Sequence, residues 1–144
     1  MKINHKLINR IIFTLGLFGL GISTYLLYTY VAKAPIVCLD SGCEIVRASS
    51  YSYFLGLPLP AYGLVMYVFI IILSFLITTL EKIVHHHLAN KLIFAAAAIG
   101  VLTSAYLTYL EAFVIKAYCT WCVTSAIVIV VIFILSVFEL RRFK

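Results

Sequence analysis

Cys119-Thr120-Trp121-Cys122 is a C-x-x-C pair that opens the last long apolar run of the chain, and residues 123–138 after it carry no charge. If that run is a membrane helix, the pair lies on its first turn, where unpaired backbone N–H groups and the helix dipole favour a thiolate. The C-x-x-C spacing also lowers a cysteine pKa, and a thiolate is the species that attacks a disulfide. A structural disulfide or half of a zinc site would use the same pair, so the rest of the chain has to discriminate between them.

The composition indicates an integral membrane protein with a single domain, residues 1–144. Of the 144 residues, 65% are hydrophobic and 11% are charged, and the mean hydropathy is +1.14. A soluble domain carries about a quarter charged residues, so a soluble protein is excluded, and no nucleic acid is expected among the partners. Charge-free runs at 11–31, 61–80, 92–110 and 119–138 are each about as long as a membrane-spanning helix. We predict an all-α bundle of four transmembrane helices, at about 8–31, 61–80, 92–113 and 119–138.

The first run could also be a signal peptide, because Ala32-Lys33-Ala34 resembles a cleavage site. The apolar region of a signal peptide is about 7–15 residues long, shorter than this run, so we expect a retained helix. The formal net charge is +6, and its distribution predicts the orientation. Eight basic residues flank the termini and the middle loop: Lys2, Lys6, Arg10, Lys82, Lys91, Arg141, Arg142 and Lys144. Three lie on the other side: Lys33, Arg47 and Lys116. The positive-inside rule then predicts a multi-pass protein of the cell membrane with both termini in the cytoplasm.

The outer loop, residues 32–60, holds the second cysteine pair, Cys38 and Cys43. Apolar residues at near-helical spacing over 44–55 predict a short amphipathic helix on the membrane surface, ended by Gly56 and Pro58; an irregular loop is the alternative. We expect this helix to cover the bundle and to exclude water from it. The side chains expected to point down are Ile45, Tyr51, Phe54 and Leu55.

The other connections are expected to be short. Residues 81–91 read as a loop and 111–118 as a tight outer turn. The three histidines 85–87 fall in the first of these, where a solvated loop is expected rather than a metal site, because three adjacent residues cannot share one helix face.

The two halves of the chain partly match at an offset of 81 residues. Gly19, Ser23, Tyr25, Leu26, Tyr28 and Cys38 fall on Gly100, Ser104, Tyr106, Leu107, Tyr109 and Cys119. The match predicts two helical hairpins in which small residues let helices approach closely. The tyrosines, Tyr106 among them, read either as an aromatic belt or as the lining of an apolar pocket.

With this topology all four cysteines face outward, into the compartment where disulfides persist. Two close pairs on one oxidising face predict a thiol–disulfide relay, in which one pair meets a soluble partner and the other an electron acceptor. Val123 follows Cys122, so a C-x-x-C-H haem attachment is absent, and a lipid-soluble quinone is the natural acceptor. Three alternatives are a zinc site, two structural disulfides, and a transporter, although no mid-membrane charge marks a transport pathway.

The order of these motifs resembles the vitamin K epoxide reductase family, in its bacterial or archaeal form. The motifs are C-x4-C in the first outer loop, then Ser49, then the sequence GLPLPAYG at 56–63, and finally C-x-x-C at the start of the fourth helix. DsbB-type quinone-linked disulfide oxidases share the chemistry but place the two cysteine patterns in the opposite order, so they are the second choice.

The resemblance implies a role for each cysteine. Cys38 would exchange with a thioredoxin-like partner, Cys43 would pass electrons to Cys119, and Cys122 would face the quinone and form an adduct with it. Ser49 matches a family serine near the quinone. The expected quinone site comprises Cys122, Ser49, Phe54, Tyr62 and Tyr106, with no metal.

The chain departs from the animal enzymes at two positions that bear on the substrate. Ala126 stands where those enzymes have a tyrosine, and Leu59 where they have an asparagine. Both departures favour a quinone, such as menaquinone or ubiquinone, over vitamin K epoxide. Since no thioredoxin domain follows residue 144, we expect the partner to act in trans.

Overall fold

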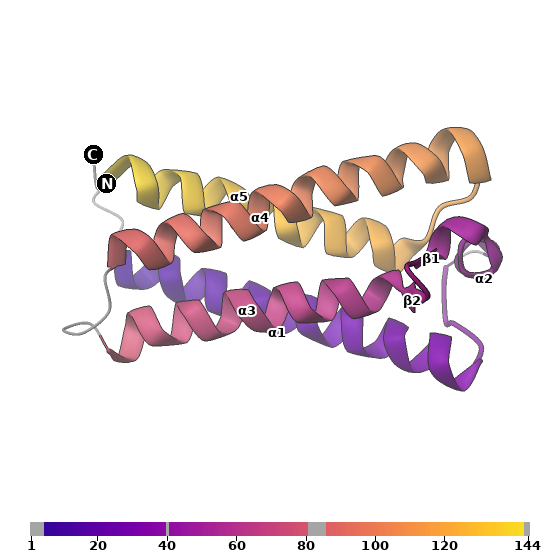
Figure 1. The fold of residues 1–144 in the computed structure, drawn as a ribbon, viewed down its shortest axis with the longest axis horizontal. Coiled ribbons are helices and arrows are strands. Elements are labelled where there is room, and N and C mark those ends of the chain that lie inside the picture. The colour runs from indigo at the N-terminus through magenta and orange to yellow at the C-terminus, as the bar shows by residue number, and fades with distance from the viewer. Residues whose placement is uncertain (1–4, 40, 81–85, 143–144) are drawn as a thin grey trace.

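Four long helices run lengthwise through the structure, a computed structural model that describes residues 5–39, 41–80 and 86–142 (Figure 1). They are α1 (His5–Ala32), α3 (Leu59–Thr79), α4 (His86–Tyr109) and α5 (Thr120–Arg142). Each contains a segment that is long and apolar enough to cross a membrane. The predicted all-α membrane bundle of four helices is therefore confirmed.

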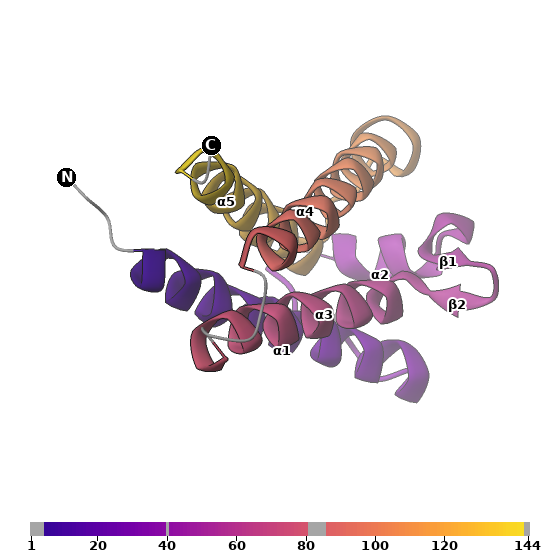
Figure 2. The ribbon, with the colours of Figure 1, turned by 60° about the vertical axis from the view of Figure 1, so that its left-hand side comes forward.

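The helices pack in a closed ring. Helix α1 contacts α3 and α5, and α4 contacts the same two neighbours. Figure 2 shows α1 and α3 on one side and α4 and α5 on the other, which are the two pairs that the internal repeat predicted. The beginning of α1 and the end of α5 lie at one end of the bundle, and the first outer loop covers the opposite end (Figure 1). We call the loop-covered end the outer end.

Close approaches at two repeat-related glycines hold the ring together. A Cβ atom on Gly19 would overlap the ring of Tyr67 on α3, and one on Gly100 would overlap Met66 and Ile129. The Tyr67 hydroxyl lies 2.9 Å from Ser125 Oγ on α5. At both glycines the space that a side chain would take is filled by large side chains of neighbouring helices, whereas the repeat predicted a close approach of the helices themselves.

The first outer loop contains a short helix, as predicted, but that helix is shorter than residues 44–55. Helix α2 spans Gly42–Ala48, and a single 3-10 turn, Ser50–Ser52, follows it. Strands β1 (Tyr53–Phe54) and β2 (Leu57–Pro58) then form an antiparallel hairpin. Leu55 and Gly56 both have positive φ, 51° and 81°, which is the backbone of a two-residue hairpin turn. That turn is incompatible with a helix running to Leu55.

The expected inward face of this helix was wrong. Ile45, Tyr51, Phe54 and Leu55 are all half-exposed or more. The buried residues are instead Gly42, Cys43, Val46 and Ser52. The reason is that the backbone of Gly42 lies against the main chain of Tyr118. This contact determines which side of α2 faces the bundle.

The loop and turn expected around the third helix are partly helical. Helix α4 begins at His86, inside the expected loop 81–91, so His86 and His87 belong to its first turn; His85 lies outside the described residues. At the outer end a π-helical turn, Leu110–Ile115, extends α4 where we expected a tight turn. Lys116 ends it in the left-handed conformation with φ 56°. Residues 112–115 are all apolar. The helix continues through them because backbone that faces a membrane must satisfy its own hydrogen bonds.

Candidate functional site: a cysteine cluster at the outer end

Both cysteine pairs pack into one hydrophobic cluster at the outer end, which we call the cysteine cluster. Its buried members are Ile22, Leu26, Ile36, Cys43, Val46, Ala117 and Cys119. Half-buried around them are Tyr25, Tyr30, Cys38, Ile115, Trp121 and Cys122. Residues from α1, α2, the π-helical turn and α5 thus enclose four sulfur atoms. The convergence of the two pairs that the sequence predicted is confirmed.

The two pairs are in different redox states. Cys38 and Cys43 form a disulfide with their Cα atoms 6.4 Å apart, whereas Cys119 and Cys122 are free thiols. A thiol pair beside a disulfide is the arrangement that thiol–disulfide exchange requires. The described residues contain no group of three or more metal-ligating side chains.

Gly42 brings the two pairs together. A Cβ atom at this position would overlap the carbonyl oxygen of Tyr118 and lie 3.1 Å and 3.2 Å from that residue's carbonyl carbon and nitrogen. Gly42 directly precedes Cys43, and Tyr118 directly precedes Cys119. A backbone-to-backbone contact therefore holds the residues next to these two buried cysteines against each other.

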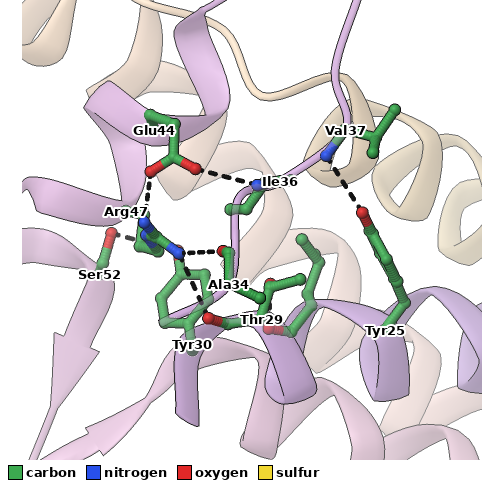
Figure 3. A network of polar contacts seen from close by, with 10 residues as sticks. Tyr25, Thr29, Tyr30, Ala34, Ile36, Val37, Glu44, Arg47 and Ser52 are labelled. Carbon is green, nitrogen blue, oxygen red and sulfur yellow. Dashed lines mark hydrogen bonds and ion pairs between the residues drawn. The ribbon is translucent and has the colours of Figure 1, made fainter. Parts of the chain in front are cut away.

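A polar network fixes α2 to the end of α1 (Figure 3). The Arg47 guanidinium donates to the carbonyl oxygens of Thr29 at 3.2 Å and Ala34 at 2.7 Å. It also pairs with Glu44 at 2.5 Å, and Glu44 accepts a hydrogen bond from the Ile36 amide at 2.9 Å. These contacts position the segment that leads into Cys38.

The tryptophan inside the C-x-x-C motif reaches the same segment. Trp121 Nε1 donates to the carbonyl oxygen of Val37 at 2.7 Å, and the Val37 amide donates to the Tyr25 hydroxyl at 3.1 Å. The Tyr25 and Trp121 rings lie 5.1 Å apart. Because Val37 precedes Cys38, the motif on α5 holds the main chain beside the first cysteine of the loop pair.

The C-x-x-C pair lies at the beginning of α5, as predicted. Cys119 directly precedes the helix and its carbonyl oxygen accepts the Val123 amide at 3.0 Å, while Cys122 lies in the first turn. A hydrogen bond from the Cys122 side chain lowers the pKa of Cys119, although burial and the nearby Glu111 carboxylate act in the opposite direction. Cys119 is therefore the thiol predisposed to ionise.

Sequence reasoning missed Glu111, which it placed in a tight outer turn. The side chain is 3% exposed, and its Oε2 accepts the Cys119 amide at 3.4 Å. It is also hydrogen-bonded to the side chain of Cys122. Glu111 could have been recognised from its position between the apolar runs 92–110 and 112–115, because a charged residue within an apolar segment needs a partner.

Ser49 joins the cysteine cluster through other hydroxyl groups. Its Oγ donates to the Val46 carbonyl oxygen at 2.7 Å and lies 3.3 Å from Ser52 Oγ. Ser52 is buried, also bonds to the Val46 carbonyl, and lies 3.5 Å from the hydroxyl of Tyr30. Ser52 and Tyr30 were not singled out from the sequence.

The other residues expected at a quinone site lie outside the cysteine cluster. The Tyr62 hydroxyl donates to the Phe54 carbonyl oxygen at 2.9 Å, and the two rings lie 6.0 Å apart. This pair therefore holds strand β1 of the hairpin against α3. Tyr106 is 59% exposed on α4. A role for these three residues in quinone binding stays a prediction.

An apolar groove of about 250 Å³ lies between α4 and α5. It is lined by Thr108, Val123, Ala126, Ile127, Val130 and Val131. Val123 follows Cys122 in the chain, and Ala126 lies one helical turn beyond Cys122. The α5 part of the lining therefore begins one residue after the C-x-x-C pair, although neither cysteine lines the groove.

The sequence profile of the vitamin K epoxide reductase family matches residues 10–137. The match takes in nearly all of the four long helices and both cysteine pairs. It agrees with the resemblance carried by the cysteine spacing and by residues 56–63.

Proposed function

Because the chain belongs to the vitamin K epoxide reductase family, whose members are in general thiol oxidoreductases that use a quinone, we propose that it oxidises a thioredoxin-like protein and reduces a membrane quinone. The observation that carries this proposal is the cysteine cluster, in which a disulfide and a pair of thiols share one enclosed site. The net outcome is disulfide formation outside the cytoplasm.

The loop pair receives the electrons. Cys38 is half-buried and stands between Val37 and Leu39, which are 74% and 93% exposed. A soluble thioredoxin-like partner acting in trans can therefore approach this sulfur, whereas Cys43 is 1% exposed. The partner's thiolate attacks Cys38, and its second thiol then resolves the mixed disulfide, leaving Cys38 and Cys43 reduced.

The internal step runs from Cys43 to Cys119. Once the C-x-x-C pair is oxidised, the Cys43 thiolate attacks Cys119 and Cys122 leaves. Cys38 then attacks Cys43 and restores the loop disulfide, and Cys119 and Cys122 become thiols again. The Gly42–Tyr118 contact supports this order because it holds Cys43, rather than Cys38, beside Cys119.

Cys122 is the residue that meets the quinone. It lies about 4.5 Å farther along the helix axis than Cys119, by the rise of three helical residues. Val123 and Ala126, which follow it on α5, line the apolar groove between α4 and α5. A menaquinone, ubiquinone or similar acceptor fits such a lining. We assign Ser49, Phe54, Tyr62 and Tyr106 to the surroundings of the quinone, with Ser49 the best supported through its hydroxyl link to the cysteine cluster.

The proposed orientation places both termini in the cytoplasm and the four cysteines outside. The beginning of α1 and the end of α5 lie at one end of the bundle, and α2 lies at the other (Figure 1). Because α2 contains Cys43, and Cys119 and Cys122 lie at the beginning of α5, this arrangement supports a single outer face for both pairs. The excess of basic residues at the terminal end supports its cytoplasmic location.

The test is quinone reduction by the purified protein with a reduced thioredoxin-like donor, combined with peptide mass spectrometry under non-reducing conditions. Cys43→Ala, mixed with the oxidised donor, is expected to accumulate a mixed disulfide, because the Cys38 thiolate attacks the donor disulfide and no Cys43 thiol remains to release the donor. Cys122→Ala is expected to trap a Cys43–Cys119 disulfide and to abolish quinone reduction. A Cys38–Cys119 disulfide in the second variant would reverse the roles of the loop cysteines. Quinone reduction retained by that variant would remove Cys122 from the site.

A further inference from the structure

Glu111 is a buried carboxyl group, and the two hydrogen bonds that its side chain makes are both to residues of the C-x-x-C pair. It is 3% exposed, it accepts the Cys119 amide, and it is hydrogen-bonded to the Cys122 side chain. Burying a carboxyl group is unfavourable unless it is hydrogen-bonded. These two contacts offset that cost; one is to the Cys122 thiol and the other is to the main chain of Cys119.

The local backbone aims Glu111 at this place. The π-helical turn Leu110–Ile115 widens the end of α4, and the Ala117 amide donates to the Glu111 carbonyl oxygen at 3.1 Å. Single π-helical turns occur frequently at functional sites. The turn directs the side chain toward α5, where the C-x-x-C pair begins.

The surroundings contain few other groups that could exchange a proton. Cys119 and Cys122 face Glu111 from α5, and the Tyr30 hydroxyl approaches the same two thiols from α1. From α2, Cys43 is in a disulfide and Arg47 pairs with Glu44. Lys116, which follows the π-helical turn, is exposed. Glu111 is thus the carboxyl group in contact with the thiol that meets the quinone.

We propose that Glu111 is a catalytic residue that carries a proton from Cys122 to the quinone; this inference rests on the proposed function. Two thiols and one quinone become one disulfide and one quinol. The S–H bonds of Cys119 and Cys122 break, the S–S bond between them forms, and two electrons pass to the quinone. Glu111 accepts the Cys122 proton and donates it to one quinone oxygen. The Cys119 proton leaves to the outer solvent, which supplies the proton for the second oxygen.

The decisive variants are Glu111→Gln and Glu111→Asp, with Glu139→Gln as the matched control. Glu139 is also 3% exposed, but it lies near the end of α5, at the opposite end of the bundle. Two quantities are measured in each variant. One is quinone reduction driven by dithiothreitol, and the other is the rate of Cys119 alkylation in fully reduced protein without quinone, followed by mass spectrometry.

The two quantities should move in opposite directions in Glu111→Gln. Quinone reduction should fall about 100-fold or more, the usual size of a general acid–base contribution. Alkylation of Cys119 should become faster at neutral pH, because the carboxylate that raises the pKa of this thiol is gone. Glu111→Asp, which keeps a titratable group, should recover part of the quinone reduction. Glu139→Gln should change neither quantity.

Three results would overturn the inference. If both quantities rise in Glu111→Gln, the carboxylate only opposes thiolate formation. If both fall, the side chain is structural. If Glu111→Asp is as slow as Glu111→Gln, the loss of a titratable group does not explain the slower quinone reduction. Absence of quinone reduction in the unmodified protein would refute the proposed function instead, so the two failures are distinguishable.

Discussion

Replacing Gly42 by alanine tests whether the contact between α2 and Tyr118 sets the electron route. The added Cβ atom would overlap the Tyr118 carbonyl oxygen and crowd its carbonyl carbon at 3.1 Å. Both sides of this contact are main chain, so no side-chain rotation can relieve the overlap. Helix α2 must move away from the beginning of α5.

Two effects of Gly42→Ala can be estimated. Inserting a methyl group into a well-packed site costs about 1–3 kcal/mol of stability. A misplacement of about 1 Å between reacting groups can slow a reaction about 100-fold, and here it would separate Cys43 from Cys119. We therefore expect partner-driven quinone reduction to fall about 100-fold by the same reasoning, with a lower melting temperature.

The control is Gly21→Ala on α1, where an added Cβ has no neighbour within 4 Å. Partner-driven quinone reduction and thermal unfolding are compared in the two variants. Both are then repeated in a Cys38→Ala, Cys43→Ala background driven by dithiothreitol, in which the C-x-x-C pair works alone. Gly42→Ala should have little effect on quinone reduction there. If Gly42→Ala matches Gly21→Ala in partner-driven activity, the backbone contact does not set the Cys43–Cys119 separation and the reasoning is refuted.

Three further predictions concern orientation, ionisation and the motif tryptophan. A membrane-impermeant thiol reagent should label the reduced protein in intact cells, and labelling that appears only after lysis would contradict the outer location of the cysteines. Because its pKa is lowered in the folded protein, Cys119 should stay alkylatable at lower pH than in unfolded protein, and Cys122→Ala should move this pH profile upward; an unchanged profile would rule out the hydrogen bond as the cause. Trp121→Phe removes the bond to the Val37 carbonyl, which should cost about 1 kcal/mol and increase hydrogen exchange at the Cys38 amide, and unchanged exchange would show that this bond does not order the loop.

The sequence alone was sufficient for the number of long helices and for the convergence of the cysteines. Membrane helices are local features, because about 20 apolar residues suffice to predict one. The cysteine pairs stand beside the ends of such helices, so a topology with both pairs on one side already predicts that they meet. The short helix α2 was also predictable, although its end was not. Leu55 adopts a positive φ that its residue type does not favour, and only the pairing of β1 with β2 reveals the turn.

The detailed site depended on the tertiary structure, because its decisive contacts join segments far apart in the chain. Nothing in the sequence distinguishes Gly42 from other loop glycines. It must lack a side chain because Tyr118, just before α5, lies against its backbone. Glu111 reads as a charge in an outer turn, and the π-helical turn that extends α4 buries it beside Cys119 and Cys122 instead. Hydropathy and spacing describe each segment separately, whereas the distance between a carboxyl group and a thiol on different helices is set by how those helices pack.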